Sequence, residues 1–255
     1  MFSILRGIAA FDAAADALRL ARRREHRFAR CVLHSAHMAR LTLSHWWRSS
    51  SSHRVRIALG LKELEYESVS VRIARGQTAA GYRDRSPTGF LPCLSVDGVE
   101  YFESVAIIEL LEERFPQPPL YPGDPHGRAR VRALVETVNS GIQPLQNTSV
   151  MAAVVRATGD GEAGLRWARE HVARGLGSLE RTMEGNHREG VTGPYAYGTT
   201  PTAADVFLVP QVASAKRFGV PLDAYPRVMT AFDEASRLEA FRRAAPEAHE
   251  PRDAS

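Results

Sequence analysis

Residues 47–59 read Trp-Arg-Ser-Ser-Ser-Ser-His-Arg-Val-Arg-Ile-Ala-Leu, and this stretch decides the fold of the surrounding region. Its four serines stand between a short apolar segment and a run in which Val55, Ala58 and Leu59 share one helical face. One serine is available as the N-cap. A helix start offers unpaired N–H groups and a positive dipole end, so this turn can hold an anion such as a thiolate. Taken alone, the serine run favours a polar loop that caps the helix and binds nothing. Support for an anion site has to come from the rest of the chain.

The composition indicates a globular protein with one large or two modest domains. The chain has 255 residues, of which 44% are hydrophobic and 24% charged. Arginines and acidic residues interrupt every apolar stretch, so we expect no membrane helix and no membrane partner. Cys31 and Cys93 give neither a disulfide framework nor zinc-ligand spacing, which favours a cytoplasmic location. The nine histidines are scattered, and we predict no metal site.

The net charge of +4 comes entirely from one end of the chain. Residues 1–37 hold seven arginines and three acidic residues, which leaves 26 basic and 26 acidic residues elsewhere. A neutral body carries no global basic field, so we expect no nucleic-acid partner. We predict that residues 1–37 are a disordered Arg-rich extension or precede the true start at Met38. A transit peptide remains an alternative, although the three acids argue against it.

Residues 38–121 have the pattern of an α/β domain. We expect strands at 41–46, 66–71, 93–96 and 99–102 and helices at 52–62 and 104–115, with a polar irregular stretch before residue 93. Asp97-Gly98 predicts a tight hairpin turn between the last two strands. For the Leu91-Pro92 bond before this hairpin, the sequence alone favours trans. The domain is therefore a βαβ unit followed by a ββα unit.

A proline-rich segment at residues 116–125 predicts a domain boundary. Residues 126–246 then form an all-helical domain, with helices at 127–157, 162–183 and 202–218 and a last helix after Pro226. Thr202 and Asp205 predict a capping box at the start of one of these helices. Residues 247–255 are expected to be a tail.

Four motifs carry a resemblance to a known family. They are Arg48-Ser49-Ser50-x-Ser52-x-Arg54-Val55-Arg56-Ile57-Ala58-Leu59, Glu103-Ser104-x-Ala106-Ile107-Ile108-Glu109, Gly141-Ile142-Gln143-Pro144-Leu145-Gln146-Asn147 and Leu208-Val209-Pro210-Gln211-Val212. With them, residues 39–246 resemble the glutathione transferase superfamily, and within it the zeta class of maleylacetoacetate and maleylpyruvate isomerases. The resemblance implies a thioredoxin-like N-terminal domain with a cis-proline, followed by an all-helical substrate-binding domain, and a homodimer.

The resemblance also implies glutathione as the cofactor. Leu91 would pair with its backbone beside a cis Pro92, and Glu103 and Ser104 would receive its γ-glutamyl end. The alternative for Glu103-Ser104 is an ordinary helix cap. Ser49 matches the sulfur-contacting serine of the family, and Ser51 stands where the eukaryotic isomerases have cysteine. The implied glutathione-binding residues are Ser49, Ser50, Ser51, Gln77, Leu91, Pro92, Glu103, Ser104, Gln143, Asn147 and Ser149, of which the last three are placed on the first long helix of the second domain.

The implied activity is cis–trans isomerisation of a dicarboxylic diketo acid, with Ser49, Ser50 and Arg48 as catalytic residues. Arg48 and Arg217 would bind its two carboxylates, because a guanidinium offers each carboxylate two hydrogen bonds. The alternative is that both arginines form surface ion pairs. Arg54 and Arg56 are expected to support the turn and the dimer contact, and His53 is given no catalytic role.

The sequence leaves the substrate open between two related acids. Residues 143–149 look like the maleylacetoacetate isomerases, whereas Ser-His-Arg at 52–54 and residues 241–246 look like the maleylpyruvate isomerases. We favour maleylacetoacetate, an intermediate of tyrosine breakdown. A protein of this fold that binds glutathione without isomerase activity remains a third possibility.

Overall fold

The computed structural model describes residues 39–251 except residues 72, 75–76 and 79–81. The predicted extension at 1–37 therefore lies outside the described residues. All the helices and strands given below belong to one compact unit, Leu41–Ser255.

The central sheet has four strands, in the spatial order β2-β1-β5-β6. These are β1 (Leu41–His45), β2 (Glu67–Ser70), β5 (Cys93–Val96) and β6 (Val99–Phe102). β1 runs parallel to β2 and antiparallel to β5, with Leu43 opposite Leu94. Both leucines are fully buried, so the centre of the sheet forms the core of this region.

The connections of the sheet confirm the predicted βαβ and ββα units. Helix α2 (Ser50–Leu61) joins β1 to β2, and helix α3 (Ser104–Arg114) follows β6. Asp97 and Gly98 have φ angles of 53° and 87°, which confirms the tight turn predicted between β5 and β6. The stretch predicted to be irregular contains a short antiparallel pair, β3 (Ile73–Ala74) and β4 (Gln77–Thr78), and the 3-10 turn η1 (Tyr82–Asp84).

The Leu91-Pro92 peptide bond is cis. The trans form favoured by the sequence alone is therefore wrong, and the cis-proline implied by the resemblance is present. The local sequence could not show this, because the surrounding fold decides between two forms that differ little in energy.

The remaining elements are helical. They are α4 (Pro125–Asn139), η2 (Gln143–Gln146), α5 (Thr148–Thr158), α6 (Ala163–Arg188), α7 (Ala203–Phe218), α8 (Pro226–Ser236), α9 (Glu239–Ala244) and η3 (Pro246–His249). The predicted capping box at α7 is present: Asp205 accepts the Thr202 N–H at 2.8 Å and also the Ala196 N–H at 2.7 Å. Within the described residues, no helix has both the length and the apolar character that crossing a membrane requires.

The single helix predicted at 127–157 is wrong, because the chain leaves the helix between α4 and α5. At Gly141 a Cβ would lie 2.6 Å from the Thr137 carbonyl oxygen, a distance that no side chain tolerates. Pro144 then lacks the N–H that a continuous helix needs. The break places η2, Asn147 and the start of α5 where they line a pocket.

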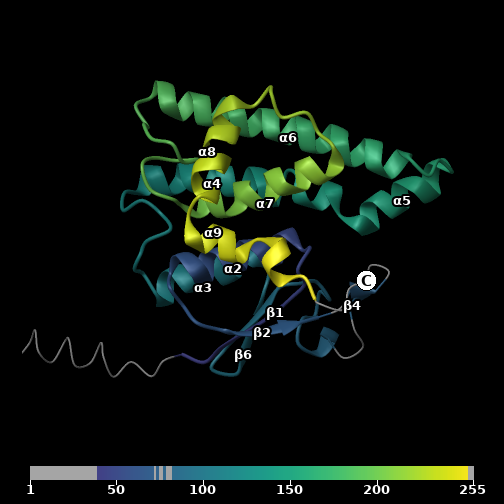
Figure 1. Cartoon of the computed structure of the whole chain (residues 1–255), viewed down its shortest axis with the longest axis horizontal. Helices are drawn as coiled ribbons and strands as arrows, with labels where there is room; N and C mark the ends of the chain where they lie inside the picture. Colours follow the sequence, from purple (N-terminus) through teal and green to yellow (C-terminus); the bar gives the residue numbers. More distant parts are fainter. Residues whose placement is uncertain (1–38, 72, 75–76, 79–81, 252–255) are drawn as a thin grey trace, which may run out of the picture. The chain divides into compact units, whose positions relative to one another are not determined.

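Helix α2 connects the sheet to the helical part. It packs on α3, α7 and α9, and Figure 1 shows α2 and α3 between the sheet and helices α4 to α8. The start of α2, where the serines lie, therefore faces both parts of the molecule.

Candidate functional site

A cavity of about 910 Å³ lies at the start of α2. Its walls are the turn between β1 and α2, the loop before the cis-proline, the start of α3, the break between α4 and α5, and the end of α7. It contains the following predicted site residues: Arg48, Ser49, Ser50, Ser51, Leu91, Pro92, Glu103, Ser104, Gln143, Asn147, Ser149 and Arg217. Gln77 lies in β4, and its side chain is outside the described part of the chain.

Ser49 and Ser50 use their hydroxyl groups differently. Ser49 is the N-cap of α2, and its Oγ accepts a hydrogen bond from the Ser52 N–H at 3.2 Å. Ser50 donates its hydroxyl proton to Gln143 Oε1 at 2.9 Å. Because the Ser49 Oγ acts only as an acceptor here, its O–H remains free to donate into the pocket. The predicted serine cap is confirmed, and Ser49 keeps a donor for an anion.

Arg54 holds three walls of the pocket together. Its guanidinium is 1% exposed and donates to Ser104 Oγ at 3.2 Å, Asn139 Oδ1 at 3.1 Å and Gln143 Oε1 at 3.3 Å. It also lies over the Phe207 ring, 4.4 Å from the centroid. Burial lowers the pKa of Arg54 to about 9. None of these bonds goes to the serine turn itself, and Arg54 is linked to it through Gln143, which also accepts from the Ser50 hydroxyl. Arg54 does not line the cavity.

Arg56 supports the same turn from the other side. It is also 1% exposed and donates to the carbonyl oxygens of Ala244 at 2.9 Å and Trp47 at 3.2 Å. A third contact joins its guanidinium to His45 Nδ1 at 3.2 Å. Arg56 thereby ties the end of β1 to α9. Burial lowers the pKa of Arg56 to about 10.

The start of α3 leaves its first N–H groups available to the pocket. Glu103 is the N-cap with a φ of 68°, and it makes no side-chain capping bond. Ser104 is the first residue of the helix and accepts a hydrogen bond from Arg54. The ordinary serine cap that the sequence left open is therefore wrong. Free N–H groups at a helix start bind a carboxylate well.

Leu91 lines the same cavity. Within the described residues, neither its N–H nor its C=O has a hydrogen-bond partner, although the residue is only 8% exposed. A backbone donor and acceptor in such a place require a partner. An extended peptide-like ligand can supply both bonds.

Arg48 and Arg217 differ from the two buried arginines. Neither forms an ion pair with a carboxylate of the described residues. Arg48 lies over the Trp47 ring at 4.3 Å, and Arg217 lies over Phe218 at 5.4 Å. Burial lowers the pKa of Arg217, and the positive charge of Arg48 lowers it further. The alternative of two surface ion pairs is wrong, and two unpaired cations share one pocket.

The prediction that Gln143, Asn147 and Ser149 lie on one long helix is wrong. Gln143 begins η2, Asn147 is the N-cap of α5, and Ser149 lies in the first turn of α5. Sequence reasoning missed the residues that hold Gln143 in place. Gln146 donates to Gln143 Oε1 at 3.0 Å and exchanges two hydrogen bonds with Gln211, at 3.1 and 3.0 Å.

Gln146 and Gln211 both belong to motifs that carry the resemblance, and this is the sequence signal that could have identified them. His53 is buried and does not line the cavity. No group of three or more potential metal ligands occurs among the residues that the structure describes.

Comparisons with known proteins agree with the geometry. The family described as "Glutathione S-transferase, N-terminal domain" matches residues 48–114. A maleylpyruvate isomerase of a Ralstonia species is 38% identical over 210 residues, which cover 82% of this chain and 98% of that protein. A maleylacetoacetate isomerase of Pseudomonas aeruginosa is 42% identical over 205 residues, which cover 79% of this chain and 93% of that protein.

Two solved structures extend the comparison. One is a holo maleylpyruvate isomerase described as a bacterial glutathione transferase of the zeta class, with a TM-score of 0.78, 37% identity and coverage of 84% of this chain and 100% of that one. The other is a maleylacetoacetate isomerase from Anaeromyxobacter dehalogenans with dicarboxyethyl glutathione and citrate in its active site. Its TM-score is 0.72 at 38% identity, and the match covers 85% of this chain and 98% of that one.

Proposed function

Because the chain belongs to the zeta class of glutathione transferases, we propose that it is a glutathione-dependent cis–trans isomerase that converts maleylacetoacetate to fumarylacetoacetate. The observation that carries the proposal is the pair of unpaired guanidiniums, Arg48 and Arg217, in the pocket that also holds the Ser49 turn. A substrate with a carboxylate at each end matches two separate cations.

Three features of the pocket fit glutathione. The free backbone groups of Leu91 suit its cysteinyl backbone, and the uncapped start of α3 at Ser104 suits its γ-glutamyl carboxylate. The free Ser49 O–H and the first N–H groups of α2 suit its sulfur. Gln143, Asn147 and Ser149 complete the lining. When bound, glutathione supplies a thiolate that can add reversibly to an activated double bond.

The protein's own residues would prepare and hold the reactants. The Ser49 O–H and the N-terminus of α2 stabilise negative charge on sulfur and so lower the pKa of a bound thiol. Ser50, whose proton is directed to Gln143, fixes the turn relative to the helical part. Arg48 and Arg217 would each donate two hydrogen bonds to one carboxylate of the substrate and hold its double bond in place.

Ser51 occupies the position of the cysteine in the eukaryotic isomerases. This replacement is compatible with the isomerase proposal, because the nucleophile belongs to the cofactor and not to this side chain. It argues against side reactions that need a cysteine at this position.

The pocket favours maleylacetoacetate over the second candidate, maleylpyruvate. Residues 143–149, whose sequence looks like the maleylacetoacetate isomerases, contribute several residues to the pocket lining. The maleylpyruvate-like residues 52–54 and 241–246 do not line it, since His53 and Arg54 are buried and α9 packs on α2. Substrate choice depends on contacts in the pocket.

We also propose a homodimer, as the resemblance implies. Val99 and Phe102 on the edge strand β6 are 55% and 36% exposed, which leaves apolar surface on this edge. The molar mass in solution, measured by light scattering, tests this.

The decisive experiment follows the absorbance of both maleyl substrates with and without glutathione. The proposal predicts loss of the cis-enone signal only with glutathione, and a higher kcat/KM for maleylacetoacetate. Activity without a thiol, or inactivity with both substrates, would reject it. Glutathione binding by calorimetry in an inactive protein would then favour a binding protein of the same fold.

A further inference from the structure

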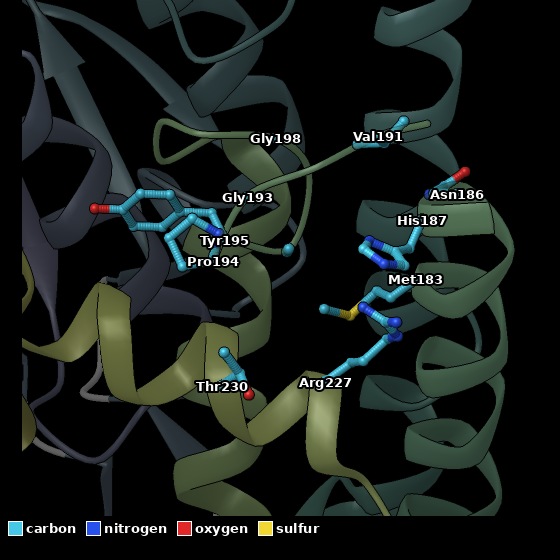
Figure 2. A pocket seen from close by; sticks show the side chains of 11 residues that line it. Met183, Asn186, His187, Val191, Gly193, Pro194, Tyr195, Gly198, Arg227 and Thr230 are labelled. Carbon is cyan, nitrogen blue, oxygen red and sulfur yellow. The ribbon is translucent and has the colours of Figure 1, made fainter. Parts of the chain in front are cut away.

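A second, smaller hollow lies in the helical part, apart from the large pocket. It measures about 70 Å³ and is bounded by the end of α6, the loop at 191–198 and the start of α8. It shares no lining residue with the large pocket. Figure 2 shows His187, Met183 and Arg227 gathered on one side of it, with Pro194 and Tyr195 opposite.

The lining of this hollow has an uneven charge. It includes Arg227 and His187 but no aspartate or glutamate. Within the described residues, neither of these two side chains forms an ion pair or a hydrogen bond. Three nearby carboxylates have other partners: Glu180 accepts the backbone N–H groups of Arg227 and Val228 at 3.0 Å each, Asp205 accepts the Ala196 N–H at 2.7 Å, and Glu189 pairs with Arg130.

Asn186 adds a buried donor without a partner. Its side-chain oxygen accepts a hydrogen bond from Arg130 at 3.3 Å, and this contact sets the orientation of the amide. Its Nδ2 is then left without a hydrogen-bond partner, although the residue is only 8% exposed and lines the hollow. A buried, unpaired N–H group is costly unless a ligand or water accepts from it.

The wall opposite Asn186 has a fixed shape. At Gly193, which has a φ of 133°, a Cβ would lie 2.0 Å from the Gly198 carbonyl oxygen. The two ends of this loop are thus packed directly against each other, and a larger residue cannot enter. Backbone in close contact therefore forms this wall, whereas side chains such as Met183, His187 and Arg227 form the wall opposite.

We propose that this hollow binds a small oxyanion, either inorganic phosphate or the carboxylate group of a small organic acid. The Arg227 guanidinium and the His187 ring would donate to its oxygens, with the unpaired Asn186 Nδ2 behind them. A volume of about 70 Å³ is sufficient for one such anionic group. This site is separate from the isomerase pocket and does not depend on the proposed activity.

Calorimetric titration of the full chain with sodium phosphate and, separately, sodium acetate tests the proposal, with ionic strength held constant by sodium chloride. All titrations are made in the Arg217→Met background, so that the large pocket contributes less anion binding. We expect one bound anion and at least tenfold weaker binding after Arg227→Met. The ratio of the phosphate to the acetate affinity identifies which source fits better.

Two further variants separate specific binding from general charge. Asn186→Asp keeps the size and the acceptor for Arg130 but replaces the free donor by a negative charge, and we expect it to abolish binding. Arg188→Met removes an equal charge next to His187 outside the lining, and we expect less than a twofold change. Equal weakening by Arg227→Met and Arg188→Met, or no binding of either anion, would overturn the proposal. Arg227→Met in the otherwise unchanged chain should leave isomerase activity intact.

Discussion

Two pairs of arginines in this molecule have opposite surroundings. Arg54 and Arg56 are buried, and their guanidiniums donate to side chains and carbonyl oxygens of the protein. Arg48 and Arg217 line the large pocket and have no carboxylate partner among the described residues. The difference indicates that a guanidinium with protein acceptors supports the fold, whereas one without them is available to a ligand.

The strongest test of the first pair is Arg56→Met. It leaves the carbonyl oxygens of Ala244 and Trp47 without their donor and separates α9 from β1. We expect a loss in the free energy of unfolding of about 3 kcal/mol, measured by urea denaturation. The matched control is Arg242→Met, in which the side chain is 61% exposed and pairs with Glu239. This control should cost less than about 1 kcal/mol, and equal losses would show that Arg56 does not support the fold in this way.

The second pair is tested by Arg217→Met. Loss of a bidentate contact to one substrate carboxylate should raise KM by about 10- to 100-fold, with a smaller change in kcat and an unchanged melting temperature. Arg217→Lys keeps the charge but not the fork of donors, so it should restore only part of the affinity. Lys216→Met is the control, because this neighbouring ammonium lies over Phe232 at 3.9 Å and does not line the pocket. A kcat loss with constant KM would assign Arg217 a different role.

The elements that the sequence predicted correctly have local causes. Asp97-Gly98 needs only the positive φ angles of a tight turn, and Thr202 and Asp205 satisfy each other within one helical turn. The local sequence favoured the wrong form of the Leu91-Pro92 bond and concealed the break after α4, because contacts with distant parts of the chain help to decide both. Gly141 and Pro144 marked the break, but the helical periodicity around them concealed it.

The predictions for the site divide in the same way, between what the sequence motifs indicate and what distant contacts decide. The resemblance named residues that the structure brings into one pocket, including Arg217, which is 168 positions from Ser49 in the β1–α2 turn. It did not predict how they are held. Arg54 and Gln143 are 89 residues apart and meet only in the folded chain, and the exchange between Gln146 and Gln211 spans 65 residues. Such bonds depend on tertiary packing, which no local pattern encodes.

The pH dependence of stability tests the surroundings of Arg56 further. Burial, together with the charge of Arg56, lowers the pKa of His45 to about 3, from 6.5 in the unfolded chain. Below pH 6.5 the unfolded state therefore binds more protons, and stability falls as the pH approaches 3. For His45 this slope reaches at most about 1.4 kcal/mol per pH unit.

The variant His45→Gln removes this titration. The difference in unfolding free energy between variant and wild type should change between pH 6.5 and 4 and stay constant above pH 7.5. Other titrating groups, such as the buried Asp205, whose pKa burial raises to about 6, largely cancel in this difference. A difference that is independent of pH would mean that His45 is protonated in the folded protein as readily as in the unfolded one.

The variant Ser49→Ala separates the capping role of this serine from its proposed role in catalysis. Loss of the bond from the Ser52 N–H should cost about 1 kcal/mol, as for other N-caps. Under the proposed function the missing O–H also raises the pKa of the bound thiol, so the rise in kcat with pH moves to higher pH, and turnover near pH 7 falls about tenfold. Ser49→Asp keeps the cap but adds a negative charge beside the sulfur. It should restore stability without restoring turnover, whereas recovery of both would mean that Ser49 acts only as a cap.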